Sequence, residues 1–161
     1  MKREELGEKV NIMTKKGGKV PTATLLTRIF STKNIKNFVK RNQEHLKLPT
    51  LAEYLAELCD RKGVKPKDVI KNADMDRFYG AEIFSGKRSN PSREYLLRLA
   101  LGLSLSYDEC QRLLTIAGKN LLYPRVQRDA VIIKCLHSGL KYHETEDLLF
   151  EMGLPTLGGY K

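Results

Sequence analysis

The chain has 161 residues, of which 41% are hydrophobic and 30% are charged. This balance provides enough apolar material for a core and excludes an intrinsically disordered chain. No apolar run is long enough to cross a bilayer, and none follows the basic N-terminus as a secretory signal peptide requires. We therefore expect a cytoplasmic protein that does not enter a membrane.

The formal net charge is +10, and the excess of positive charge lies at the N-terminal end. Residues 1–50 contain 12 Lys/Arg and 4 Asp/Glu, whereas residues 105–161 contain seven of each kind. A basic segment favours polyanionic partners, nucleic acid ahead of an acidic membrane surface. The competing interpretation is a solvated segment that only promotes solubility.

The three cysteines, Cys59, Cys110 and Cys135, are far apart in the chain, and each lies within an apolar helical pattern. Buried free cysteine behaves as a small hydrophobic residue, so we expect reduced core thiols. The three histidines form no ligand pattern with these cysteines. The sequence therefore predicts no metal site, and it indicates no cofactor.

The N-terminal end is expected to consist of an arm and a helical extension. Residues 1–21 have weak apolar periodicity and a break at two consecutive glycines, and they predict a flexible basic arm. Residues 22–48 predict two helices, the first starting near Thr22 or Thr24 and the second capped by Asn34.

Residues 49–118 contain the sharpest local signals, and we expect five helices there. Capping boxes at Thr50–Glu53 and Ser106–Glu109 predict two helix starts, because the hydroxyl and the carboxylate of each box satisfy backbone amides of the first turn. Gly63 is expected to end the first helix. Pro66 is expected to begin the second, where no amide donor is needed.

The second and third of these helices are expected at Pro66–Ala73 and Met75–Ser85. We expect Asp74 to cap the third helix and Gly86 to end it in a left-handed conformation. Two helices this short and this closely joined must cross steeply. That is the geometry of a helix-turn-helix, although other helix pairs share it.

The fourth helix of this segment is predicted to open with Asn90 as its cap and Pro91 as its first helical residue. Its leucines, from Leu96 onward, are expected to line a buried face. Two arginines on the same helix, Arg93 and Arg98, are interpreted as solvated side chains.

The C-terminal third predicts a helical pair and then a tail. The pair is expected at Pro124–Leu136 and His143–Met152, within an extension of residues 119–153, and residues 154–161 are expected to be loose. No segment alternates with a period of two, so the chain is predicted to be all-α. It also contains no phosphate-binding loop, nucleophile–base pair or metal motif, so we expect no enzyme.

The stretch "IFSGKRSNPSREYLLRLALGL", within Leu51–Glu109, combines a Gly-Lys-Arg turn with a proline-initiated, leucine-rich helix. It resembles the phage-repressor-like (Cro/CI, XRE) helix-turn-helix family of transcriptional regulators. The resemblance covers about a third of the chain. It implies a lambda-repressor-like five-helix domain over residues 49–118, flanked by two N-terminal helices and the C-terminal helical pair.

The resemblance also implies that Met75–Ser85 is the DNA recognition helix. Its base-reading positions would be Asp76, Arg77, Phe78, Ala81 and Glu82. Arginine can pair with a guanine edge, glutamate can accept from a cytosine amine, and apolar side chains can touch a thymine methyl group. The phosphate contacts would come from four basic residues at the ends of the two helices, Lys65, Lys67, Lys87 and Arg88.

Four positions depart from the family pattern. Pro66 stands where the family often has glutamine, and Ile70 stands where it commonly has alanine. Asp74 replaces the usual glycine of the turn, and Gly80 replaces an apolar helical residue. Acidic side chains on or near the reading face are also unfavourable next to an anionic duplex.

Two functions follow as hypotheses. The first is a sequence-specific double-stranded DNA-binding transcriptional regulator, in which a homodimer would read two half-sites. The alternative is a protein-interaction module on the same fold, such as an antitoxin, an anti-repressor or a phage-defence partner, with weak or no DNA binding. The partners expected are therefore double-stranded DNA, a second copy of the chain or another protein.

Overall fold

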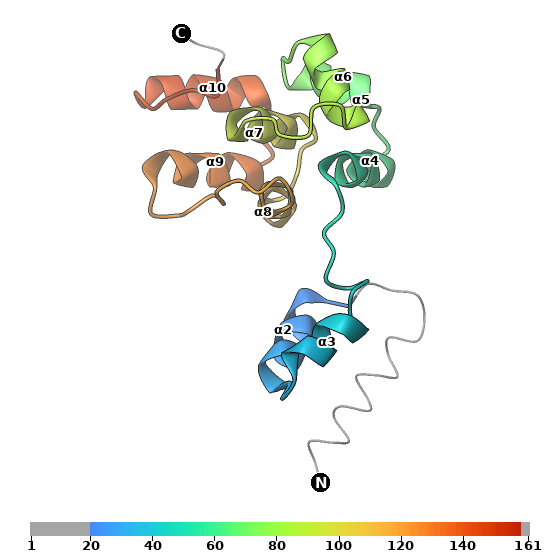
Figure 1. Cartoon of the computed structure of the whole chain (residues 1–161). Coiled ribbons are helices and arrows are strands. Elements are labelled where there is room, and N and C mark those ends of the chain that lie inside the picture. Colours follow the sequence, from blue (N-terminus) through green and yellow to red (C-terminus); the bar gives the residue numbers. More distant parts are fainter. Residues whose placement is uncertain (1–19, 159–161) are drawn as a thin grey trace. The chain divides into compact units, whose positions relative to one another are not determined.

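The computed structural model describes residues 20–158, and all regular secondary structure in that range is helical. This confirms the all-α class. The chain separates into two compact units, unit 1 (residues 1–48) and unit 2 (residues 49–161). Between residues 20 and 158 it forms nine helices (Figure 1): α2 (Thr22–Ser31), α3 (Ile35–Arg41), α4 (Leu51–Lys62), α5 (Pro66–Asn72), α6 (Arg77–Ser85), α7 (Arg93–Gly102), α8 (Tyr107–Ile116), α9 (Gln127–His137) and α10 (Tyr142–Glu151).

Unit 1 contains α2 and α3, and neither helix has a buried residue. The side chain of Asn34 caps α3 as expected, because its Oδ1 accepts a hydrogen bond of 3.0 Å from the amide of Asn37. Residues 20–48 carry six Lys/Arg and one Glu. The flexible arm expected at residues 1–21 lies outside the described residues, apart from its last two.

In unit 2, the strongest local signals mark helix boundaries as predicted. Both capping boxes form, at the starts of α4 and α8. Pro66 is the first residue of α5. Gly63 and Gly86 end their helices with φ of 66° and 84°, a left-handed conformation that glycine adopts without steric cost.

Three predicted helix starts are wrong by two or three residues. The cap of α6 is Asp76, whose Oδ1 accepts from the amide of Tyr79 at 2.9 Å, and not Asp74. Helix α7 is capped by Ser92, so Asn90 and Pro91 precede it. Helix α9 begins at Gln127, because the residues after Pro124 form a turn first.

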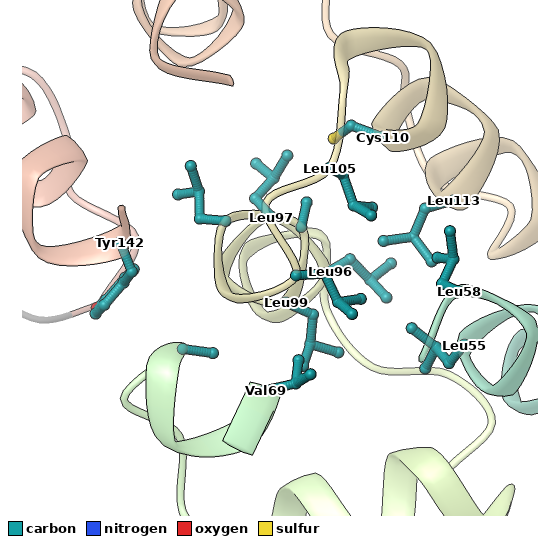
Figure 2. Packing of buried hydrophobic residues seen from close by; sticks show 14 of the residues in the cluster. Leu55, Leu58, Val69, Leu96, Leu97, Leu99, Leu105, Cys110, Leu113 and Tyr142 are labelled. Atoms are coloured by element: carbon teal, nitrogen blue, oxygen red, sulfur yellow. The ribbon is translucent and has the colours of Figure 1, made fainter. Parts of the chain in front are cut away.

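Helix α7 lies at the centre of unit 2 and is buried on nearly every side, from Leu96 to Leu101. Figure 2 shows its leucines in the middle of the core, with Leu55 and Leu58 of α4, Val69 of α5 and Tyr142 of α10 around them. The hydrophobic core of unit 2 is therefore organised around one helix that contacts α5, α8 and α10.

The C-terminal helices belong to the same core. Apolar residues of α9, α10 and the segment after α10 join the cluster formed by α4–α8, namely Ile132, Leu136, Tyr142, Leu149 and Leu157. The expected loose tail is wrong for its first part. Leu157 is 2% exposed, and its amide donates to Oε1 of the buried Glu146 at 2.5 Å.

Ion pairs also join α7 to α9, contrary to the expectation that Arg93 is solvated. Arg93 forks onto Asp129 with hydrogen bonds of 3.0 and 3.3 Å. Arg128 in turn forks onto Glu94, and its Nε donates to the carbonyl of Pro155 at 2.7 Å.

Within residues 20–158, no helix is both long and apolar enough to span a bilayer.

Candidate nucleic-acid interface

The helices α5 and α6 are joined by only four residues, 73–76. Asp74 has φ of 49°, which is the left-handed region, and it occupies the turn position where the resembled family has glycine. Met75 follows with its side chain buried and its amide donating to the carbonyl of Ile70 at 3.1 Å. The turn therefore keeps the glycine-like backbone conformation with an aspartate, one of the residues that tolerate it best.

A buried arginine donates hydrogen bonds to the turn between α5 and α6. Arg98 of α7 is 9% exposed, although the sequence predicted a solvated side chain. Its Nε donates to the carbonyl of Ala73 at 3.1 Å, and its Nη2 donates to the carbonyl of Asp74. The guanidinium also lies 4.9 Å from the centroid of the Tyr142 ring and 5.3 Å from that of Tyr95. Helix α10 thus contacts the group that fixes the turn.

The outer face of α6 presents most of the predicted base-reading residues to solvent. Asp76, Arg77, Phe78 and Ala81 are exposed, and Phe78 is 70% exposed. The guanidinium of Arg77 lies 4.9 Å from the centroid of the Phe78 ring. An exposed Phe this close to an arginine gives the start of α6 a surface that is both cationic and apolar.

Glu82 differs from the other predicted base-reading residues, because it is paired. Its Oε2 accepts from Nε and Nη2 of Arg88 at 3.1 and 2.8 Å, and Nζ of Lys87 lies 3.5 Å from its Oε1. The hydrogen bond from Arg88 is the main reason that the pKa of Glu82 lies below its ordinary value. One predicted base reader therefore neutralises two predicted phosphate contacts.

The backbone explains how residues six apart meet. Gly86 turns the chain back at the end of α6, and the amide of Arg88 donates to the carbonyl of Glu82 at 3.0 Å. The Arg88 guanidinium then also lies 4.3 Å from the ring centroid of Tyr79, which itself is 4.3 Å from that of Tyr95. The pairing of Glu82 with Arg88 could not be predicted from the sequence, because residues six apart are not neighbours on a helix.

The basic residues on the other flank form no salt bridge with any described carboxylate. Lys65 and Lys67 are exposed on either side of Pro66, at the start of α5. In the described part of the chain, no salt bridge engages the four cations of this flank, Lys65, Lys67, Lys71 and Arg77. The α5 flank is therefore the part of this surface where positive charge is not neutralised.

The described residues contain no group of three or more His, Cys, Asp or Glu side chains that could hold a metal ion. Comparisons with protein-family models, with curated proteins and with solved structures find no match to this chain.

Proposed function

We propose that the protein is a sequence-specific double-stranded DNA-binding transcriptional regulator, with α4–α8 as a lambda-repressor-like helix-turn-helix domain and α6 as the recognition helix. The observation that carries the proposal is the exposed α6 face of Arg77, Phe78 and Ala81, with Lys65 and Lys67 beside it, which form no salt bridge among residues 20–158. Side chains of these types suit base edges, and lysines suit the adjacent phosphates.

In this proposal, Arg77 pairs with the O6 and N7 atoms of a guanine, because its fork of donors matches those two acceptors. Phe78 and Ala81 contact thymine methyl groups. The carboxylate of Asp76 accepts from the amide of Tyr79, so its role is to fix where α6 begins. Arg98 supports the reading indirectly, by holding the turn that sets the angle of α6.

Affinity would come from phosphate contacts on both sides of α6. Lys65 and Lys67 have no ion pair to break within the described part of the chain, whereas Lys87 and Arg88 must exchange Glu82 for a phosphate. Unit 1, with six Lys/Arg and one Glu in residues 20–48, would add attraction that does not depend on sequence. A second copy of the chain would read a second half-site about one helical turn away.

The test is selection of duplexes from a random pool by the full chain at two salt concentrations, followed by affinity measurements on the selected site. We expect one enriched motif. Arg77→Ala should weaken binding to that motif by about 1–3 kcal/mol and relax specificity at one base pair. Lys65→Ala should weaken binding to every duplex and reduce the salt slope by about one.

The matched control is Arg125→Ala, which removes the same side chain from an exposed position in the loop before α9. It should bind as the wild type does. Selection that enriches no motif would refute sequence-specific reading. An Arg77→Ala variant with unchanged affinity and specificity would refute the assignment of α6.

A further inference from the structure

A groove of about 760 Å³ lies between the outer sides of α5 and α6 and is open to solvent. Its apolar lining comes from both helices and the turn, and includes Ile70, Met75 and Phe84. Asp74 is the only carboxylate among the lining residues, whereas three cations line the groove, Lys67, Lys71 and Arg77.

The combination of these residues restricts what the groove can bind. A small inorganic anion would pair with the cations but leave the apolar lining in water. An uncharged apolar ligand would cover the lining but remove water from cations that no described carboxylate pairs with, which is unfavourable. The groove is therefore complementary to a ligand that is both apolar and negatively charged.

The shape of the groove favours one face of a helix over a small molecule. Sites for small molecules usually enclose most of the ligand surface, whereas this groove is open between two helices. An amphipathic helix lays apolar side chains spaced by three or four residues into such a groove and keeps its polar face in water. Aspartate and glutamate beside those apolar residues would meet the cations of the groove.

We propose that the α5–α6 groove binds a short acidic amphipathic helix of a protein partner. Lys67, Arg77 and Ala81 line the groove and also belong to the surface proposed to contact DNA. A helix in the groove would therefore prevent α6 from entering a major groove. Binding of the helix does not depend on the proposed DNA-binding function, but competition with DNA does.

The experiment begins with selection from a displayed library of random peptides, each long enough for about four helical turns, against the full chain. We expect selected peptides with net negative charge and large apolar residues at helical spacing. The best peptide is then synthesised with a fluorophore and titrated against the protein by anisotropy. A version with its acidic residues changed to lysine should lose measurable binding.

Lys71→Glu is the informative protein variant, because Lys71 lines the groove but is not among the proposed DNA contacts. It should weaken peptide binding by about tenfold or more. Lys134→Glu, the same reversal at an exposed position on α9, is the matched control and should leave binding unchanged. Thermal unfolding of both variants shows that a loss of binding is not a loss of fold.

Selected peptides that are basic, or that bind Lys71→Glu as tightly as the wild type, would overturn the proposal. A stable ternary complex of peptide, protein and duplex would refute the competition with DNA but not the binding of the helix, because only the competition depends on sharing Lys67, Arg77 and Ala81. Peptide binding without duplex binding would retain this inference and end the DNA-binding proposal. Duplex binding with no selected peptide would retain the DNA-binding proposal and end this inference.

Discussion

Ile70 of α5 fills the space that a side chain at position 80 of α6 would need. A Cβ atom added to Gly80 would lie 2.6 Å from Cγ1 and 2.7 Å from Cγ2 of Ile70. Both positions depart from the pattern of the resembled family, one by being larger and the other by being smaller. The two departures fit each other, because a large residue on one helix meets a missing side chain on the other.

This relationship predicts a strong coupling between the two positions. Gly80→Ala should destabilise unit 2 by about 1–2 kcal/mol, because overpacking outweighs the gain in helix propensity. Ile70→Ala should cost about 2–5 kcal/mol by leaving a cavity. The double variant should lose less unfolding free energy than the two single variants lose in sum, by about 1 kcal/mol or more. Urea unfolding of all four proteins measures this cycle, and additive effects would contradict the packing.

The hydrogen bonds of Arg98 to the turn predict a second large effect on the stability of unit 2. Arg98→Met removes the guanidinium that donates to the carbonyls of Ala73 and Asp74. The methionine side chain has no N–H group, so both carbonyls lose this hydrogen bond. The expected loss is about 2–4 kcal/mol, since hydrogen bonds from charged groups to buried partners are among the strongest. Urea unfolding provides the measurement.

Two further variants separate charge from geometry at this position. Arg98→Lys keeps the charge but not the planar fork, so it should restore less than half of the loss. Arg112→Met removes an exposed arginine whose guanidinium lies 5.6 Å from the ring centroid of Tyr54, and it should cost less than about 1 kcal/mol. Equal losses for Arg98→Met and Arg112→Met would show that the turn does not depend on Arg98.

Glu82→Gln tests the electrostatics of the proposed DNA surface. Removing the carboxylate frees Lys87 and Arg88 from their ion pairs, so affinity for duplex DNA should rise by about threefold to tenfold and become steeper in salt. The matched control Glu151→Gln removes the same charge from the end of α10 and should change affinity little. Weaker binding by Glu82→Gln would instead indicate that Glu82 contacts a base.

The pH dependence of this effect has a definite sign. The pKa of Glu82 lies below the ordinary value for a glutamate, so the carboxylate is still ionised at a pH where an ordinary glutamate begins to take up a proton. The affinity ratio of Glu82→Gln to wild type should therefore be constant from about pH 6 to 8. It should fall toward one only in acid, where Glu82 itself becomes protonated and releases the two cations. A ratio that changes between pH 6 and 8 would exclude Glu82 as the responsible group.

The cysteines are predicted to be unreactive in the folded protein. All three are free and buried, and burial raises the pKa of Cys110 to about 12 and that of Cys59 and Cys135 above the ordinary value. A disulfide-based thiol reagent at mildly alkaline pH should label none of them until urea unfolds the chain, and then label all three. Fast labelling of one thiol in the native protein would show that its part of the core opens.

The elements that depend on neighbouring residues could be predicted from the sequence. The capping box that begins at Thr50 and the left-handed glycine at position 86 act within one turn of backbone, so their signals are complete in a short stretch. The start of α6 was predicted two residues early because two aspartates, Asp74 and Asp76, both suit a cap. Local sequence does not decide which of them takes the left-handed turn position.

Contacts between distant segments could not be predicted in this way. Arg98 has an ordinary sequence context on α7, and its burial depends on carbonyls 24 and 25 residues earlier. Arg93 likewise meets Asp129 on a helix that was expected to be a separate extension. For the candidate interface, the exposed positions of α6 were expected from the family resemblance, but the pairing of Glu82 with Arg88 required the path of the chain around Gly86.

The contacts of α7 with the C-terminal helices predict that a chain shortened after α8 is destabilised. A chain cut after Gly118 would keep the five helices α4–α8 of unit 2 but deprive Arg93 and Glu94 of their ionic partners and remove the Tyr142 ring beside Arg98. The apolar area that α9 and α10 cover would then face water. For a soluble fragment for binding or spectroscopy, we therefore expect the chain to have to extend at least to Leu157.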